Sequence, residues 1–245
     1  MAPVPLPTPR DRNLFFAWST YTTDYETFAR WYDEEHIPQV MDAPGMVGAQ
    51  RFVIADTKPL PGVNSLDFGH LALYELEGPP AGFREEVKRK LISQEMVLPE
   101  YMVQPFKGLF LKPVSEPFCA ASFGRAHDLD DRHLFFAWSR HAGDDETFAK
   151  WYDEEHIPQI MSAPGFLRAQ RFDISEVKPL PGVITPDLGH VVICETAGDL
   201  QGFRKEVKRQ LISGETVIPE FVIGPISTMF LKPVSPFFLA QGTPA

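Results

Sequence analysis

Histidine and tyrosine side chains at a few positions have the chemistry needed to move protons. His36 and His156 each follow a Trp-Tyr-Asp-Glu-Glu run, and His70 and His190 each follow a glycine. An imidazole titrates near neutrality, so it can take a proton from a carbon next to a carbonyl group. Tyr74 offers a phenol that can donate to a developing enolate oxygen. These five side chains are our candidate acid–base catalysts.

Each candidate also has a purely structural interpretation. A histidine at the C-terminal end of a helix can bond a free carbonyl group, which would account for His36 and His156. A histidine bonded to a backbone carbonyl beside a core tyrosine would account for His70 and Tyr74. The sequence leaves both interpretations open.

Other side chains are suited to holding a hydrophobic substrate. Arg51 and Arg171 can orient a carboxylate or phenolate, although pairing of Arg51 with Glu34 or Glu35 is the simpler role. The many aromatic residues favour an aromatic or polycyclic ligand over a sugar, and the sequence has no glycine-rich phosphate loop. The predicted substrate-binding residues are Trp31, Tyr32, Arg51, Trp151, Tyr152, Arg171 and Cys194.

The acidic run Asp33–Glu35 and its copy Asp153–Glu155 do not predict a metal site. Three consecutive helical residues spread over most of the helix circumference and cannot face one ion, and Glu35 diverges from His36 for the same reason. We therefore expect no metal. The acid–base chemistry expected of the histidines and Tyr74 needs no cofactor, and none is expected.

The sequence contains the same pattern twice, at a spacing of about 120 residues. LFFAWS occurs at Leu14–Ser19 and Leu134–Ser139, and WYDEEHIPQ occurs at Trp31–Gln39 and Trp151–Gln159. Two units of one fold are expected. The copies differ where Tyr74 becomes Cys194, Tyr21 becomes His141, Tyr25 becomes Asp145, Gly48 becomes Arg168 and Val53 becomes Asp173. If these positions line cavities, the two cavities differ in chemistry and at most one is catalytic.

Local patterns predict the elements that position these residues. Apolar runs, alternation and helical spacing indicate strand, helix, strand, strand, helix and strand in each copy. In the first copy these are Leu14–Thr20, Asp24–His36, Val47–Ala55, His70–Glu77, Gly82–Glu95 and Lys107–Lys112, with Pro38 ending the first helix and Thr57–Phe68 forming a long loop. The order βαββαβ is that of a ferredoxin-like unit, whose antiparallel sheet carries both helices on one side. Its other side needs a cover, which a second sheet would supply.

We expect an α+β protein of two tandem ferredoxin-like units whose antiparallel sheets pack face to face. The expected divisions are an N-terminal extension at 1–12, the first unit at 13–115, a linker at 116–132, the second unit at 133–235 and a C-terminal tail at 236–245. Alternation along strand His70–Glu77 places His70, Ala72 and Tyr74 on one face and Leu71, Leu73 and Glu75 on the other.

Composition excludes several classes of partner. A formal net charge of −10 argues against nucleic acid. The two cysteines are too few for a disulfide framework, and neither a secretion signal nor a membrane-spanning run is recognisable, so we expect a cytoplasmic protein that binds no membrane.

The aromatic helix ending in WYDEEHIPQVMDAPG and the following GAQRF strand resemble the EthD-like branch of the dimeric α+β barrel superfamily. This resemblance implies a barrel of two ferredoxin-like units in fused form, and it implies that a His and Tyr pair can enolise a substrate. Relatives include cyclases, isomerases, decarboxylases and cofactor-free monooxygenases. The leading hypothesis is a cofactor-independent isomerase, cyclase, dehydratase or other lyase acting on a hydrophobic, aromatic or ketone-bearing molecule. A cofactor-free monooxygenase and a non-catalytic binding or stress-response protein are the alternatives, and a homodimer of the fused chain is open.

Overall fold

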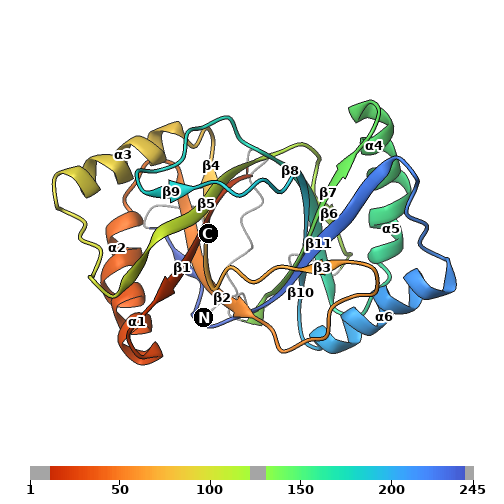
Figure 1. Cartoon of the computed structure of the whole chain (residues 1–245), viewed down its shortest axis with the longest axis horizontal. Coiled ribbons are helices and arrows are strands. Elements are labelled where there is room, and N and C mark those ends of the chain that lie inside the picture. The colour runs from red at the N-terminus through yellow and green to blue at the C-terminus, as the bar shows by residue number, and fades with distance from the viewer. Residues whose placement is uncertain (1–11, 122–130, 241–245) are drawn as a thin grey trace.

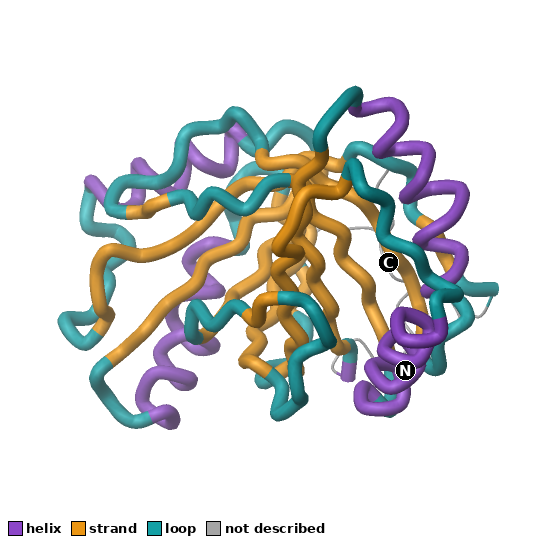
Figure 2. Tube along the Cα trace, turned by 45° about the vertical axis from the view of Figure 1, so that its right-hand side comes forward, coloured by secondary structure: helices purple, strands orange, loops and turns teal. Residues whose placement is uncertain are grey.

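The computed structural model describes residues 12–121 and 131–240, and within them the chain forms a closed barrel of antiparallel strands flanked by helices (Figures 1 and 2). We call 12–121 the first half and 131–240 the second half. Eight long strands follow one another around the barrel in the order β2-β4-β1-β5-β8-β10-β7-β11. Pairing of β11 with β2 closes it. The fold class is therefore α+β, as expected.

The same order of elements occurs in both halves. The first half contains β1 (Arg12–Tyr21), α1 (Tyr25–Trp31), α2 (Ile37–Val40), β2 (Met46–Ile54), β3 (Asn64–Ser65), β4 (His70–Glu77), α3 (Ala81–Ile92), β5 (Met102–Pro113) and β6 (Phe118–Cys119). The second half contains β7 (His133–His141), α4 (Asp145–Trp151), α5 (Ile157–Ile160), β8 (Phe166–Ile174), β9 (Val183–Ile184), β10 (His190–Thr196), α6 (Leu200–Ser213), β11 (Val222–Pro233) and β12 (Phe238–Leu239).

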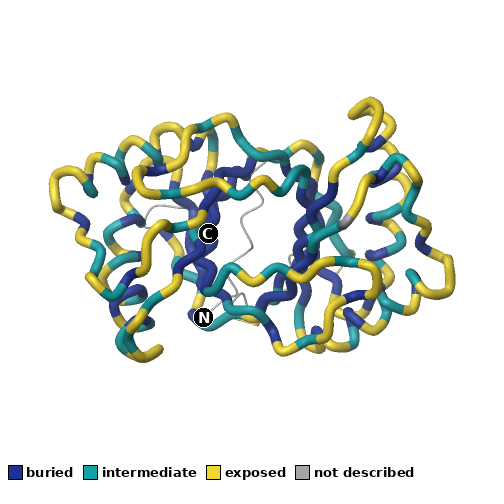
Figure 3. Tube along the Cα trace, in the orientation of Figure 1, coloured by how far each residue is buried: buried dark blue, intermediate teal, exposed yellow. Residues whose placement is uncertain are grey.

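Strand alternation divides the buried residues between two kinds of core. Leu71 and Leu73 join the apolar interior of the barrel, whereas Ala72 and Tyr74 pack towards the helices. Inside the barrel the rings of Phe16 and Phe136 stack across the two halves at 4.9 Å between centroids. Buried positions accordingly follow the strands, and exposed positions lie on the outer sides of the helices (Figure 3). The expected assignment of faces in β4 is confirmed for these residues.

The two halves exchange segments at their edges. β3 extends from the first half to pair with β11, and β9 extends from the second half to pair with β5 (Figure 1). β6 pairs with β8, and β12 pairs with β2. The segments expected to be a linker and a tail thus contain strands of the sheet, while residues 1–11 of the extension, 122–130 of the linker and 241–245 of the tail lie outside the described residues.

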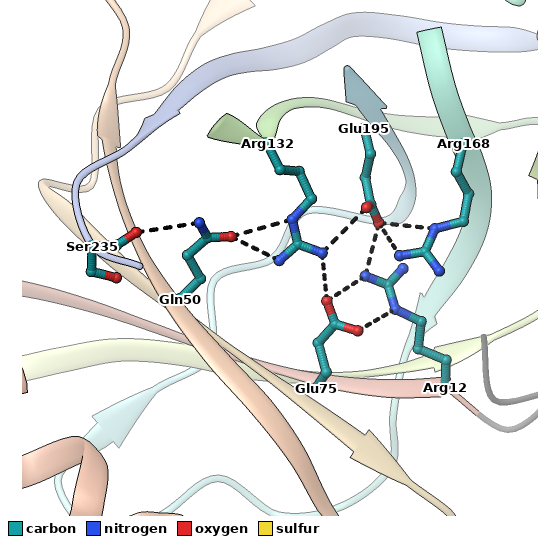
Figure 4. Close-up of polar contacts among 7 residues, drawn as sticks. All are labelled: Arg12, Gln50, Glu75, Arg132, Arg168, Glu195 and Ser235. Atoms are coloured by element: carbon teal, nitrogen blue, oxygen red, sulfur yellow. Dashed lines mark hydrogen bonds and ion pairs between the residues drawn. The ribbon is translucent and has the colours of Figure 1, made fainter. Parts of the chain in front are cut away.

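A buried cluster of ion pairs fills the barrel where β1 and β7 begin (Figure 4). Arg12 and Glu75 come from the first half, and Arg132, Arg168 and Glu195 come from the second. Arg12 Nη2 lies 2.8 Å from Glu195 Oε1, and Arg132 Nη1 lies 2.7 Å from Glu75 Oε1. The ion pairs therefore connect the two halves. Every one of these side chains is at most 2% exposed.

The cluster keeps both carboxylates charged. Burial alone would raise the pKa of each glutamate, but the facing guanidinium groups outweigh burial. They lower the pKa of Glu195 to about 2 and that of Glu75 well below its usual range.

Gly48 and Arg168 occupy equivalent positions at this end of the barrel, and neither lines one of the two cavities between the helices and the sheet. A Cβ atom at Gly48 would overlap the ring of Phe237. In the second half the Arg168 side chain instead bonds Glu195.

Among the described residues, no helix combines the length and the apolar character needed to cross a bilayer.

Candidate functional site

His36 lies in a π-helical turn, Tyr32–His36, that joins α1 to α2. The amide of Ile37 donates to the carbonyl of Tyr32, five residues back, so the helical path widens and continues to Val40 past Pro38. The expected helix end at His36 was therefore wrong, and His36 does not cap a terminal turn. Turns of this kind are frequent at functional sites.

The first cavity lies between the helices and the sheet of the first half. Its volume is about 620 Å³ including its open mouth. The lining is mostly apolar, and Phe15, Phe83, Val87 and Met102 form much of it. The polar side chains of this lining are those of Ser19, Tyr32, His36 and Tyr74. The Lys107 ammonium instead lies over the ring of Phe68, 4.5 Å from its centroid.

The protonation states of these groups follow from their burial. Burial lowers the pKa of His36 to about 4, so its imidazole is neutral at physiological pH. Burial and the neighbouring Tyr32 raise the pKa of Tyr74 well above its usual value, so its phenol keeps its proton. The predicted substrate-binding residue Trp31 stacks on His36 with 4.8 Å between ring centroids and fixes the imidazole plane.

Several polar atoms at this cavity are buried without a hydrogen-bond partner among the described residues. They are His36 Nδ1, Ser19 Oγ and the Tyr74 hydroxyl. The two hydroxyl groups lie close to the Tyr32 hydroxyl, whereas His36 Nδ1 has no polar neighbour of this kind in the described part of the chain. Leaving such atoms unsatisfied costs free energy that a polar ligand can recover. The first cavity therefore has the character of a binding site.

His70 faces the helices like Tyr74, but the structure does not bring the two together in the first cavity. They are four positions apart along β4, which corresponds to roughly 13 Å. Arg51 forms a bidentate pair with Asp33 at 2.6 Å, not with Glu34 or Glu35, and its Nη1 donates to His70 Nε2 at 3.0 Å. Burial and Arg51 lower the pKa of His70 to about 3. Both Arg51 and His70 are thus held in a polar contact beside the first cavity.

The second cavity is the equivalent space in the second half, with a volume of about 970 Å³ including its mouth. His156 lines it and stacks on Trp151 at 4.7 Å between centroids, and burial lowers the pKa of His156 to about 4. Tyr152 is hydrogen bonded to Ser139 at 3.1 Å. Cys194 replaces the phenol of Tyr74, and burial raises the pKa of its thiol to about 12. The second cavity therefore has a histidine but no counterpart of the Tyr74 donor.

Each cavity is completed by a loop from the other half. Leu180, Pro181 and Val183 line the first cavity, and Leu60, Pro61 and Val63 line the second. Arginines on α3 and α6 hold these loops: Arg84 Nε donates to the Lys178 carbonyl at 3.1 Å, and Arg204 Nη2 donates to the Pro59 carbonyl at 3.0 Å. Sequence reasoning identified the Thr57–Phe68 loop but not its destination.

His190 and Arg171 also lie outside the second cavity. Arg171 pairs with Asp153 at 2.7 Å, as Arg51 does with Asp33. His190 Nδ1, however, bonds Asp173. His141 lies beside His190, with 5.1 Å between ring centroids. Three positions at which the two copies differ, His141, Asp145 and Asp173, thus lie around His190. In the sequence, only the comparison of the two copies pointed to these residues.

Comparison with known proteins supports the fold. No protein-family model matches the chain, and no curated protein matches it. An anthrone oxidase-like protein of known structure is similar, with a TM-score of 0.58 and 12% identity over 96% of each chain. The "Putative monooxygenase" of Fusobacterium nucleatum is similar with a TM-score of 0.56 and 12% identity, over 98% of this chain and 96% of that chain. At this identity the likeness shows a shared α+β barrel fold.

Proposed function

We propose that the first cavity is the active site of an enzyme that transfers protons on a hydrophobic, aromatic or ketone-bearing small molecule. The proposal rests on the buried polar atoms of His36, Tyr74 and Ser19, which lie together on an otherwise apolar wall, with His36 Nδ1 left without a hydrogen-bond partner among the described residues. An apolar cavity with a few convergent polar groups is the usual form of a small-molecule site.

The protonation states suit enolisation. The neutral imidazole of His36 takes a proton from the carbon next to a substrate carbonyl. The electron pair of that C–H bond forms a C=C bond, and the carbonyl π electrons move to oxygen. The phenol of Tyr74 donates a hydrogen bond to that oxygen. The proton on His36 then returns to another atom of the substrate.

This chemistry serves an isomerase, a cyclase, a dehydratase or another lyase. The names of the two similar structures point to a specific alternative, in which a substrate enolate formed in the same cavity reacts with oxygen. Oxygen dependence separates the two, because proton transfer alone proceeds anaerobically. A binding protein would take up ligand and exchange no substrate protons.

We also propose that the barrel consists of two fused ferredoxin-like units of the EthD-like branch. The identical order of elements in the two halves and the β5–β8 and β11–β2 pairings that join them support this. The fused arrangement lets the two cavities differ, and the loss of the phenol at Cys194 favours the first cavity as the active one.

The test is exchange of the acidic α-protons of α-tetralone, a bicyclic aromatic ketone, in D₂O under argon, followed by proton NMR. We expect the protein to accelerate exchange. His36→Gln and Tyr74→Phe should each slow it by about 10²-fold, the usual scale of acid–base catalysis. Tyr25→Phe is the matched control, because it removes a hydroxyl from an exposed tyrosine on the same half.

Two results would contradict the proposal. Unchanged exchange in Tyr74→Phe would remove the donor role, and loss of exchange in His156→Gln but not in His36→Gln would place the chemistry in the second cavity. Mass spectrometry of small molecules that co-purify with the protein would then identify the natural ligand class.

A further inference from the structure

Four side chains with metal-binding chemistry gather at one rim of the second half. This rim cluster consists of His141, Asp145, Asp173 and His190. One potential ligand atom from each of His141, Asp145 and His190 lies within 4.8 Å of the others. His141 Nε2 is 3.2 Å from Asp145 Oδ1. The cluster joins the end of β7, the start of α4, the end of β8 and the start of β10, so four separate elements converge on it.

The first half shows what this rim contains without the cluster. Its equivalent positions hold Tyr21, Tyr25 and Val53, which offer no imidazole or carboxylate. The packing is nevertheless the same: Tyr21 stacks on Phe28 at 3.9 Å between centroids, and His141 stacks on Phe148 at 4.2 Å. The three differences therefore place two potential metal ligands, His141 and Asp145, and the carboxylate of Asp173 in the same surrounding structure.

The histidine common to both halves is also held differently. In the first half His70 Nε2 accepts a hydrogen bond from Arg51. In the second half His190 Nδ1 bonds the carboxylate of Asp173. The carboxylate accepts a hydrogen bond from Nδ1–H of His190, and this tautomer of the imidazole has its lone pair on Nε2. A metal-binding histidine usually donates its other ring N–H to a carboxylate, a backbone carbonyl or water, which fixes the orientation of the imidazole.

We propose that the rim cluster binds one divalent transition-metal ion through His141, Asp145 and His190, while Asp173 orients His190. Two imidazole nitrogens and one carboxylate form a donor set typical of zinc and non-haem iron sites. Bonds of about 2.0–2.2 Å to one ion bring ligand atoms to within roughly 3–4 Å of one another, so the cluster needs a closure of about 1 Å. Asp145 can supply it, because its side chain is 90% exposed.

The site would be open on one side. The His141 side chain is only 7% exposed and is fixed against Phe148, whereas Asp145 and His190 reach solvent. Three protein ligands leave positions for water or for an oxygen ligand, as in catalytic rather than structural metal sites. This inference uses none of the residues of the first cavity and stands or fails independently of the proposed function.

The test is calorimetric titration of the EDTA-treated, tag-free full chain with Zn²⁺, with Co²⁺ absorption as a second readout. We expect one Zn²⁺ per chain. Asp145→Asn and His190→Ala should each weaken binding by at least tenfold, and Asp173→Asn should weaken it by about 10–100-fold. The triple variant H141Y/D145Y/D173V restores the residues of the first half and should bind none. His133→Gln is the control histidine and should leave the titration unchanged.

Failure to bind one equivalent of Zn²⁺, or one-equivalent binding that survives in the triple variant, would overturn the proposal. Circular dichroism and thermal unfolding establish that the variants are folded. If the triple variant does not fold, Asp145→Asn decides the question, because this exposed side chain contributes little to packing. Unchanged Zn²⁺ affinity in Asp145→Asn would then refute the site.

Discussion

Replacing Glu75 by glutamine tests whether the buried ion pairs hold the two halves of the barrel together. The Glu75 carboxylate accepts from Nε and Nη2 of Arg12, each at 2.9 Å, and from Nη1 of Arg132 at 2.7 Å. Glutamine keeps the shape but removes the charge, and its NH₂ group cannot accept from a guanidinium. Among the described residues, Glu195 would then be the single carboxylate that pairs with Arg12, Arg132 and Arg168.

The expected loss of stability is large because the guanidinium groups of Arg12 and Arg132 stay buried, out of contact with bulk water, when the carboxylate charge is removed. Removing one partner from a buried ion pair costs about 3–5 kcal/mol, since the other charge stays buried without compensation. Whole domains unfold with free energies of only about 5–15 kcal/mol. With a urea dependence of about 1–3 kcal/mol per molar, the midpoint of unfolding should fall by at least about 1 M.

Urea unfolding followed by tryptophan fluorescence measures this loss, because Trp18 and Trp138 lie in the barrel interior. Glu77→Gln is the control, since Glu77 is exposed on the same strand. A Glu75→Gln variant within about 1 kcal/mol of Glu77→Gln would refute the reasoning, because exposed pairs contribute only about 0–1 kcal/mol.

The same reasoning predicts a pH dependence with a definite sign. The pKa of both glutamates is lower in the folded chain than in the unfolded chain, where it is close to 4.5. Their stabilisation is therefore complete above about pH 4.5 and is lost as the pH falls through about 2. The difference between wild type and Glu75→Gln should shrink over that range.

Two further predictions concern the histidines and the exchanged loops. The pKa of His70 falls from 6.5 to about 3 on folding, so the free energy of unfolding should decrease as the pH drops below 6.5. Urea titrations at a series of pH values measure this decrease. In His70→Asn the decrease should be shallower by at most ~1.4 kcal/mol per pH unit. A slope that His70→Asn leaves unchanged would be evidence against a buried neutral imidazole. Leu180→Glu should slow α-tetralone exchange about tenfold by placing a charge in the wall of the first cavity, while the matched variant Leu60→Glu alters only the second cavity. Equal effects of the two variants would contradict separate cavities.

Local patterns predicted the main elements well. The strand His70–Glu77 has the predicted bounds, and α3 begins one residue before the predicted Gly82 and ends at Ile92 rather than Glu95. Alternation and helical spacing are properties of neighbouring residues, so a sequence carries them directly. The π-helical turn was missed because a change of hydrogen-bond register leaves no periodic signal in five residues.

Features that depend on distant partners were not predictable in the same way. The Thr57–Phe68 loop has prolines and turn residues in its sequence, but nothing local indicates that Asn64–Ser65 pairs with β11. Only the burial of Glu75 could be predicted for the ion-pair cluster, because Glu75 shares a strand face with Leu71 and Leu73. Its partners Arg132 and Arg168 belong to another half of the chain, and no spacing rule connects them to Glu75.

Differences between the two copies carried more functional information than the residues they share. A framework position such as Phe16 and its equivalent Phe136 must stay the same, because each packs against the other across the barrel core. Positions facing a cavity or the rim are free of that constraint, so they can change in one half alone. The phenol of Tyr74 is kept only in the first cavity, whereas the ligand groups of His141 and Asp145 occur only at the rim of the second half. A chain with two equal sites would carry these groups in both halves. Because each group occurs in one half only, the sequence favours two different functions within one barrel.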